Sequence, residues 1–236
     1  MYISIENIDR FCEENDIINE LLSLDNKHII ELGCGKAELT RDIATSGTRR
    51  RVTAFEIDAI QHAENDKVSN LPNVSFKHGA AENIAMEDNV ADVAFMFKSL
   101  HHVAVTSMDE AFSELHRVLK KDGYLYISEP IFSGDFNDIL RLFHNEEVVR
   151  AAAFNAEKKA INAGLFKLVK QVFFNVSMHF DDFAAFENLV LGVTHTNFVL
   201  SPEVFREVKT KFEKHIDDDG VNFSMPVRVD LLQNTK

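Results

Sequence analysis

The chain has 236 residues, which is enough for one large domain with a full hydrophobic core. Its 38 acidic residues outnumber 25 basic ones, and the formal net charge is −13. A nucleic-acid surface or an anionic-membrane surface would need a basic patch, so we expect neither partner. No apolar run approaches the ~20 residues of a membrane helix. The two distant cysteines and the lack of an apolar signal region in residues 1–10 favour a reducing cytoplasm.

The N-terminal segment, residues 1–27, is predicted to contain two short amphipathic helices. Their apolar residues recur at helical spacing in two groups. These are Ile5, Ile8, Phe11 and Cys12, followed by Ile17, Ile18, Leu21 and Leu22.

Residues 28–130 alternate between strands and helices. The expected strands are His28–Glu31, Arg51–Glu56, Val74–Lys77, Ala91–Phe97 and Tyr124–Ser128. The expected helices between them are Glu38–Ser46, Ala59–Val68 and Thr106–Leu119. Strands that alternate with helices predict an α/β fold with a doubly wound parallel sheet.

The alternation stops after Pro130. Residues 131–166 are predicted to be mostly helical and to form a lid, inserted after the fifth strand, over the carboxyl ends of the strands. A strand, two helices and a last strand should follow, at Lys167–Phe180, Phe183–Leu191, from Pro202 onward, and Asn222–Gln233. We therefore expect a single domain, 1–236, with a mostly parallel seven-stranded sheet. Its parts would be N-terminal helices (1–27), a cofactor-binding core (28–130), a helical lid (131–166) and C-terminal strands and helices (167–236).

The stretch His28–Ala37, H-I-I-E-L-G-C-G-K-A, is the first candidate site. A strand, a tight turn at Gly33 and Gly35, and a helix bring backbone N–H groups close to a ligand, and glycine leaves the approach open. A dinucleotide fingerprint would place a third glycine where this chain has Glu38. Together with Glu31, this carboxylate disfavours a pyrophosphate and favours a ligand that carries positive charge.

The second candidate is Glu56, which ends the second strand 21 residues after Gly35. Nucleoside-binding folds of this kind place an acidic residue at that spacing to accept hydrogen bonds from a ribose diol. A carboxylate suits this task because it offers two acceptor oxygens.

Four segments, in order and at ordinary spacing, resemble motifs of one family. E-L-G-C-G-K-A resembles motif I of the class I SAM-dependent methyltransferases, with Ala37 in place of the last glycine. H-G-A-A-E-N-I from His78 resembles the family's G-D-A-E-x-L-P segment, and K-S-L-H-H-V from Lys98 resembles its L-H-H-V signature. G-Y-L-Y-I-S-E-P from Gly123 resembles its fifth strand. The resemblance covers residues 28–130 and is closest to the methyltransferase type 11 group.

The resemblance implies a Rossmann-like methyltransferase fold that binds S-adenosylmethionine (SAM) and releases S-adenosylhomocysteine (SAH). Ala80 stands where the family usually has an Asp that holds the adenine amino group, so backbone groups or Glu82 would take over that contact. Phe97 and Lys98 would face the methionine part of the cofactor. The expected cofactor-binding residues are Glu31, Gly33, Cys34, Gly35, Glu56, Ile57, Ala80, Ala81, Glu82, Phe97 and Lys98.

Candidate catalytic residues are His101 and His102, either as a general base or as pocket residues. His144, His179 and His195 lie in the C-terminal part, where groups specific for the acceptor would be found. No metal site is predicted, because adjacent histidines such as His101 and His102 cannot share a helix face.

The expected reaction is in-line methyl transfer to a small-molecule acceptor, by a monomer or a homodimer. Of the 20 Phe residues, 14 follow Pro130, and some of them would line an apolar chamber under the lid. Two other functions stay open: a non-catalytic SAM- or SAH-binding protein, and a NAD-dependent oxidoreductase, against which Glu38 counts.

Overall fold

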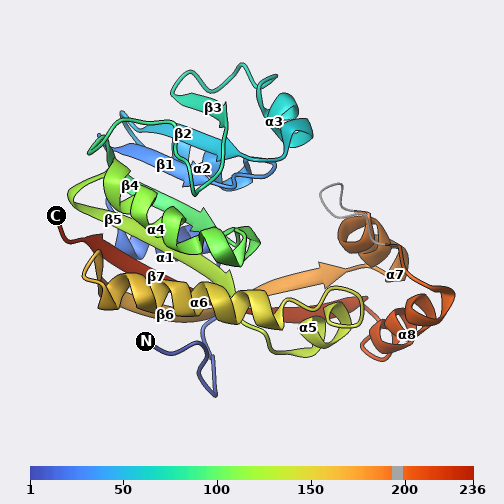
Figure 1. Ribbon diagram of the computed structural model, residues 1–236. Helices are drawn as coiled ribbons and strands as arrows, with labels where there is room; N and C mark the ends of the chain where they lie inside the picture. Colours follow the sequence, from blue (N-terminus) through green and yellow to red (C-terminus); the bar gives the residue numbers. More distant parts are fainter. Residues whose placement is uncertain (193–198) are drawn as a thin grey trace.

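Seven strands form one sheet in the computed structural model, which describes residues 1–192 and 199–236 (Figure 1). The strand order is β3-β2-β1-β4-β5-β7-β6. The pairs among β1 to β5 are parallel, whereas β7 is antiparallel to both β5 and β6. This confirms the predicted doubly wound, mostly parallel seven-stranded sheet. The strands are β1 His28–Leu32, β2 Arg51–Glu56, β3 Val74–His78, β4 Ala91–Phe97, β5 Leu119–Pro130, β6 Phe166–Phe180 and β7 Val221–Asn234.

The N-terminal segment contains one helix, α1 (Glu14–Leu21), and not the two that its apolar spacing predicts. Residues 5–12 instead run beside β6, where Phe11 forms a parallel bridge with Asn175. The Asn175 N–H donates to the carbonyl of Arg10 at 2.7 Å, and its carbonyl accepts from the Cys12 N–H at 3.2 Å. Since β6 is an edge strand with unpaired backbone groups, extended pairing outweighs a short isolated helix.

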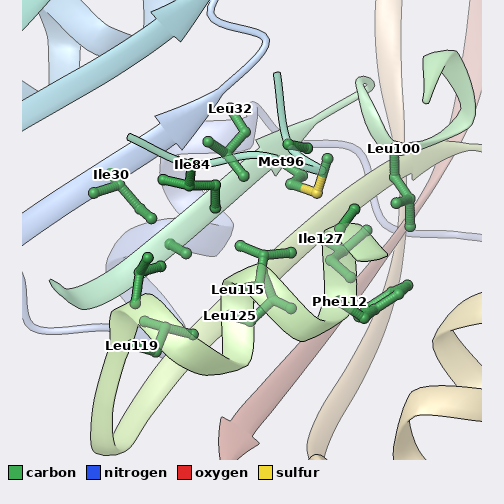
Figure 2. Packing of buried hydrophobic residues seen from close by; sticks show 14 of the residues in the cluster. Ile30, Leu32, Ile84, Met96, Leu100, Phe112, Leu115, Leu119, Leu125 and Ile127 are labelled. Atoms are coloured by element: carbon green, nitrogen blue, oxygen red, sulfur yellow. The ribbon is translucent and has the colours of Figure 1, made fainter. Parts of the chain in front are cut away.

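Helices cover both faces of the sheet. On one face, Ile17 and Ile18 of α1 and Ile43 of α2 (Glu38–Thr45) are buried in one cluster with residues of the strands. On the other face lie α4 (Met108–Val118) and α6 (Glu147–Asn162). Figure 2 shows Phe112 and Leu115 of α4 against apolar side chains of β1, β4 and β5. The helix α3 (Ala59–Asn65) follows β2, and two 3-10 turns, η1 (Leu100–His102) and η2 (Val105–Ser107), lie between β4 and α4.

A separate hydrophobic cluster, called the second cluster or second core here, lies beyond the core that the helices form on the two faces of the sheet. The antiparallel pair of β6 and β7 extends past the other strands and carries α5, α7 and α8 around its far end (Figure 1). The buried rings of this cluster are Phe136, Phe180, Phe183, Phe186, Phe212 and Phe223. Its helices are α5 (Asp135–Leu140), α7 (Phe183–Phe186), a π-helical turn η3 (Glu187–Leu191) and α8 (Pro202–Glu213).

The helical lid predicted for residues 131–166 is not confirmed. α6 is part of the helix layer, because Ala153 and Ala160 are buried in the same cluster as α4. Phe136 of α5 packs into the second cluster, 5.7 Å from the Phe223 ring. The excess of apolar side chains in this segment therefore reflects two cores that need cover. Each helix in the described ranges falls short of the length and apolar character that crossing a bilayer demands.

A buried polar cluster joins α6 to β7. Arg228 of β7 donates to Asp230 at 2.5 Å and lies 3.6 Å from a carboxylate oxygen of Glu157 on α6. Its guanidinium also stacks on the Phe154 ring, 4.5 Å from the centroid. Neither Glu157 oxygen has a hydrogen-bond partner among the described residues. One cation thus faces two buried carboxyl groups, and burial with the charge of Asp230 raises the pKa of Glu157 well above 4.5.

Replacing Glu157 with Gln should stabilise the protein increasingly as the pH rises. The folded state keeps a proton on Glu157 that the unfolded chain loses above pH 4.5, so the free energy of unfolding of the wild type should fall with rising pH. The uncharged variant should lack that contribution to the pH dependence of the free energy of unfolding. Urea unfolding at several pH values measures it, with exposed Glu110→Gln as the control. Parallel pH profiles for the wild type and Glu157→Gln would mean that Glu157 is ionised and paired with Arg228.

Candidate functional site

The glycine turn after β1 is fastened to the end of β2. The N–H groups of Gly33 and Cys34 both donate to the Phe55 carbonyl, at 2.9 and 3.0 Å. Gly33 and Gly35 have φ values of +75° and +52°, which lie in the left-handed region that glycine adopts without strain. The turn therefore lies at the carboxyl ends of β1 and β2, as the sequence predicts.

The two glycines differ in what a side chain would meet. A Cβ on Gly33 would lie 2.8 Å from the Cβ of Ser99, whereas a Cβ on Gly35 would meet nothing within 4 Å among the described residues. Gly33 is thus required for packing against Ser99. Gly35 faces open space, which is where a ligand can approach the turn.

Glu56 closes the turn through its carboxylate. One oxygen accepts from the Gly35 N–H at 2.7 Å, and the other accepts from the Asp58 N–H at 2.9 Å. Each oxygen retains a second lone pair, so that the carboxylate can still accept from a ligand. Glu56 is therefore positioned rigidly at the end of β2.

Glu31 is a buried carboxylate with few neighbouring groups to balance its charge. Its Oε2 accepts from the Thr40 hydroxyl at 2.6 Å. Burial raises the pKa of Glu31 to about 7, the Thr40 hydrogen bond opposes this rise, and the nearby charge of Glu56 adds to it. A buried acid without a paired cation favours a ligand that brings positive charge.

Two further residues near the turn have structural roles. Cys34 is buried, and burial raises the pKa of its thiol well above the usual range, so it does not form a thiolate readily. The Asn65 side chain of α3 donates to the Gly35 carbonyl at 2.8 Å and to the Cys34 sulfur at 3.5 Å. Asn65 and Thr40 were not expected from the sequence, since neither lies in a motif.

Four further expected cofactor residues, Ile57, Ala80, Ala81 and Glu82, follow the carboxyl ends of β2 and β3 in the chain. Ile57 follows β2 and is 61% exposed, which is unusual for a large apolar side chain beside a buried carboxylate. Ala80 forms an isolated bridge with Asn83, whereas the side chain of Ala81 is buried in the main core. Glu82 is half-buried.

At the end of β4, Phe97 and Lys98 come next to α1. Phe97 stacks on Phe95 with ring centroids 4.9 Å apart. Lys98 is exposed and has a φ of +52°, a strained conformation for a residue with a side chain. Its charge acts on the buried Glu14 of α1, which accepts hydrogen bonds from the hydroxyls of β5 residues Tyr126 and Ser128 at 2.6 and 2.8 Å. α1 is thereby fixed next to the end of β4.

His101 is held between two carboxylates. Its Nδ1 bonds to Glu129 of β5, and its Nε2 lies 3.4 Å from Glu146. Burial by itself would lower the pKa of His101, but the charge and hydrogen bond of Glu129, aided by Glu146, raise it to about 9. The ring thus carries both protons at neutral pH. In this state His101 cannot accept a proton, which argues against its expected role as a general base.

His102 is exposed, and its ring centroid lies 4.1 Å from that of His101. The sequence argument against a metal site considered only whether the adjacent histidines share a helix face. In the structure a third potential ligand, Glu146, approaches the pair from a distant segment. One ligand atom each of His101, His102 and Glu146 lies within 4.8 Å of the others.

The other expected histidines are dispersed. The His144 Nε2 lies 2.8 Å from Glu146, beside the pair. His179 is exposed on β6 and contacts Asn222 and Asp181. His195 lies outside the described residues.

Comparisons with known proteins agree with this geometry. Residues 30–127 match the family model of a methyltransferase domain. The sterol 4-C-methyltransferase strm-1 of Caenorhabditis elegans is 29% identical over 126 residues, which are 51% of this chain and 36% of that protein. An uncharacterized methyltransferase of Staphylococcus carnosus is 24% identical over 141 residues, 59% of this chain and 65% of that protein. The chain thus spans less than two thirds of the length of each relative.

The crystal structure of the YcgJ protein of Bacillus subtilis has the same fold. It superposes with a TM-score of 0.65 at 14% identity, covering 94% of this chain and 97% of that one. At this identity the likeness concerns the fold alone. Residues 30–127, which contain the glycine turn joined to Glu56, are thus similar to a methyltransferase domain, and the fold agrees with that similarity.

Proposed function

We propose that the protein binds SAM at the carboxyl ends of β1, β2 and β4 and transfers its methyl group to a small-molecule acceptor. The observation that carries the proposal is the joined arrangement of Glu31, the Gly33–Gly35 turn and Glu56 at one edge of the sheet. A sulfonium and an ammonium give SAM the positive charge that this edge favours.

The residues present fit the cofactor. Gly35 leaves an open approach to the turn, and the described part of the chain places no cationic side chain against the buried Glu31. Glu56 would accept from the ribose hydroxyls with its remaining lone pairs. The exposed Ile57 would cover one face of the adenine, and the backbone of Ala80 and Ala81, or the Glu82 side chain, would contact its edge.

Methyl transfer from SAM requires little of the protein beyond positioning the two reactants. The sulfonium of bound SAM supplies an activated methyl group, so a nucleophile that is aligned with it and shielded from water can displace it. Phe97, Lys98 and the adjacent α1 would position the methionine part and exclude water. A proton acceptor is required only where the acceptor atom carries a proton, and we assign no residue to it.

The acceptor is expected to be a small molecule. A net charge of −13 disfavours a polyanion. The acceptor need not lie under a lid, because α6 and α5 pack into the two cores. The two competing functions, a non-catalytic SAM- or SAH-binding protein and a NAD-dependent oxidoreductase, remain distinguishable by experiment.

Ligand binding separates these functions. SAM and SAH should raise the melting temperature of the protein, because both bind only the folded state, and NADH should not. A differential scanning measurement with the three ligands is the test. A response to NADH alone would contradict the assignment of the site, and binding of SAH without turnover of any acceptor in a broad panel would favour a non-catalytic role.

Glu56→Ala should weaken SAH binding by about 1–3 kcal/mol, because it removes charge-assisted hydrogen bonds to the ribose. Isothermal calorimetry measures the change. Since Glu56 also holds Gly35 and Asp58, Glu56→Gln provides a variant of the same shape, and exposed Glu64→Ala is the surface control. Unchanged affinity in both Glu56 variants would remove this residue from the binding site.

SAH affinity should rise with pH up to about pH 7 and then level, apart from the titration of the ligand itself. A ligand ammonium favours the ionised form of Glu31, whose pKa in the free protein is about 7. Binding at pH 6 must therefore expel a proton, which weakens it about tenfold relative to the plateau. Glu31→Gln should remove this contribution to the pH dependence, so the ratio of the SAH affinities of the wild type and the variant isolates it. A constant ratio from pH 6 to 8 would mean that Glu31 does not face the ligand.

A further inference from the structure

Three potential metal ligands converge at the carboxyl ends of β4 and β5. They are the imidazoles of His101 and His102 on η1 and the carboxylate of Glu146, the residue before α6. The His101 Nε2 lies 3.4 Å from the Glu146 Oε1. Two ligands of a tetrahedral ion with bonds of about 2.0–2.1 Å lie roughly 3.3 Å apart, so this pair already has the required spacing.

His101 and Glu146 are each held in place by further contacts. The Nδ1 of His101 bonds to Glu129, whose other oxygen accepts from the Leu100 N–H at 3.0 Å. A carboxylate behind a histidine is the usual way in which proteins orient an imidazole toward a metal ion. The Oε2 of Glu146 accepts from Arg150 of α6 at 2.6 Å, which leaves the Oε1 directed at the histidines.

The third ligand and the open side complete the arrangement. His102 is exposed and supplies the third ligand atom, which lies within 4.8 Å of the ligand atoms of His101 and Glu146. The Nε2 of His144 lies 2.8 Å from the same Glu146 oxygen and places another imidazole at the rim. Three protein ligands leave the fourth coordination position of a tetrahedral ion open for a further donor.

We propose that His101, His102 and Glu146 bind a divalent first-row transition-metal ion. Two imidazoles and one carboxylate suit Zn²⁺, Fe²⁺ or Co²⁺, whereas Mg²⁺ and Ca²⁺ prefer oxygen ligands alone. The ion takes the place on the His101 Nε2 that a proton otherwise holds. The hydrogen bond between the His101 Nδ1 and Glu129 is retained.

The position of the ion suggests the class of acceptor, an inference that rests on the proposed function. η1 begins two residues after Lys98, at the end of β4 that would face the methionine part of SAM. An ion there has an open position for an oxygen of the acceptor, such as a hydroxyl, enol or carboxylate group. The ion would orient that oxygen and favour its deprotonated form.

The test measures metal binding directly, on the untagged full chain after treatment with a chelator. Calorimetry with Zn²⁺ should give one site per chain, and Co²⁺ should produce the visible absorption of a site with nitrogen ligands. His102→Ala and Glu146→Gln should each lower Zn²⁺ affinity by more than tenfold, and Glu129→Gln by about 10–100-fold. His179→Ala, which removes an exposed histidine near Asp181, is the matched control and should leave the affinity unchanged.

SAH affinity, measured on the same samples, reports whether each variant is folded and separates the two proposals. Retained SAH binding with loss of Zn²⁺ binding in His102→Ala supports the metal site. Equal Zn²⁺ affinity in the wild type, His102→Ala and His179→Ala would overturn it, because only scattered surface histidines would then be binding. Zn²⁺ binding that depends on His102 in a protein that does not bind SAH would support the metal site and contradict the proposed cofactor.

Discussion

The parallel pairing of β1, β2, β4 and β5 is the constraint on which the candidate site depends. Because these strands run in one direction, their carboxyl ends meet at one edge of the sheet, and residues far apart in sequence become neighbours. Glu56, Lys98 and Glu129 each lie at such an end. The turn after β1 is tied to this edge twice, through the Phe55 carbonyl and through the Glu56 carboxylate.

Several carboxylates share this edge, and they differ in how their charge is balanced. Glu56 accepts from two backbone N–H groups, and Glu129 accepts from a backbone N–H and from His101. Glu31 has the Thr40 hydroxyl, and the rise of its pKa from 4.5 to about 7 corresponds to about 3 kcal/mol against its ionised form. The proposed binding of SAM would offset this cost, because its ammonium group carries positive charge.

The C-terminal part of the chain shows how a second core changes the interpretation of apolar residues. β6 and β7 are longer than the other strands, and α5, α7 and α8 bury Phe136, Phe186 and Phe212 against the far end of this antiparallel pair. Those rings therefore stabilise the pair of strands. α6 contacts η1, and Glu146, the residue directly before α6, lies beside His101.

The sequence by itself determined the order of the strands along the chain, the bounds of many elements to within a few residues, and the edge of the sheet where the glycine turn meets Glu56. These features depend on local signals, namely buried apolar runs, the glycine turn and the spacing from Gly35 to Glu56, and the bounds of β2 and β4 agree to the residue. Only the tertiary structure decided three others. Pairing of the segment around Phe11 with an edge strand replaced the first predicted helix. Within the predicted lid, α6 packed into the helix layer and α5 into the second core. Glu146 lies beside His101 although 45 residues separate them in the chain. Each of these depends on which segments become neighbours in space, and no local pattern in the sequence records that.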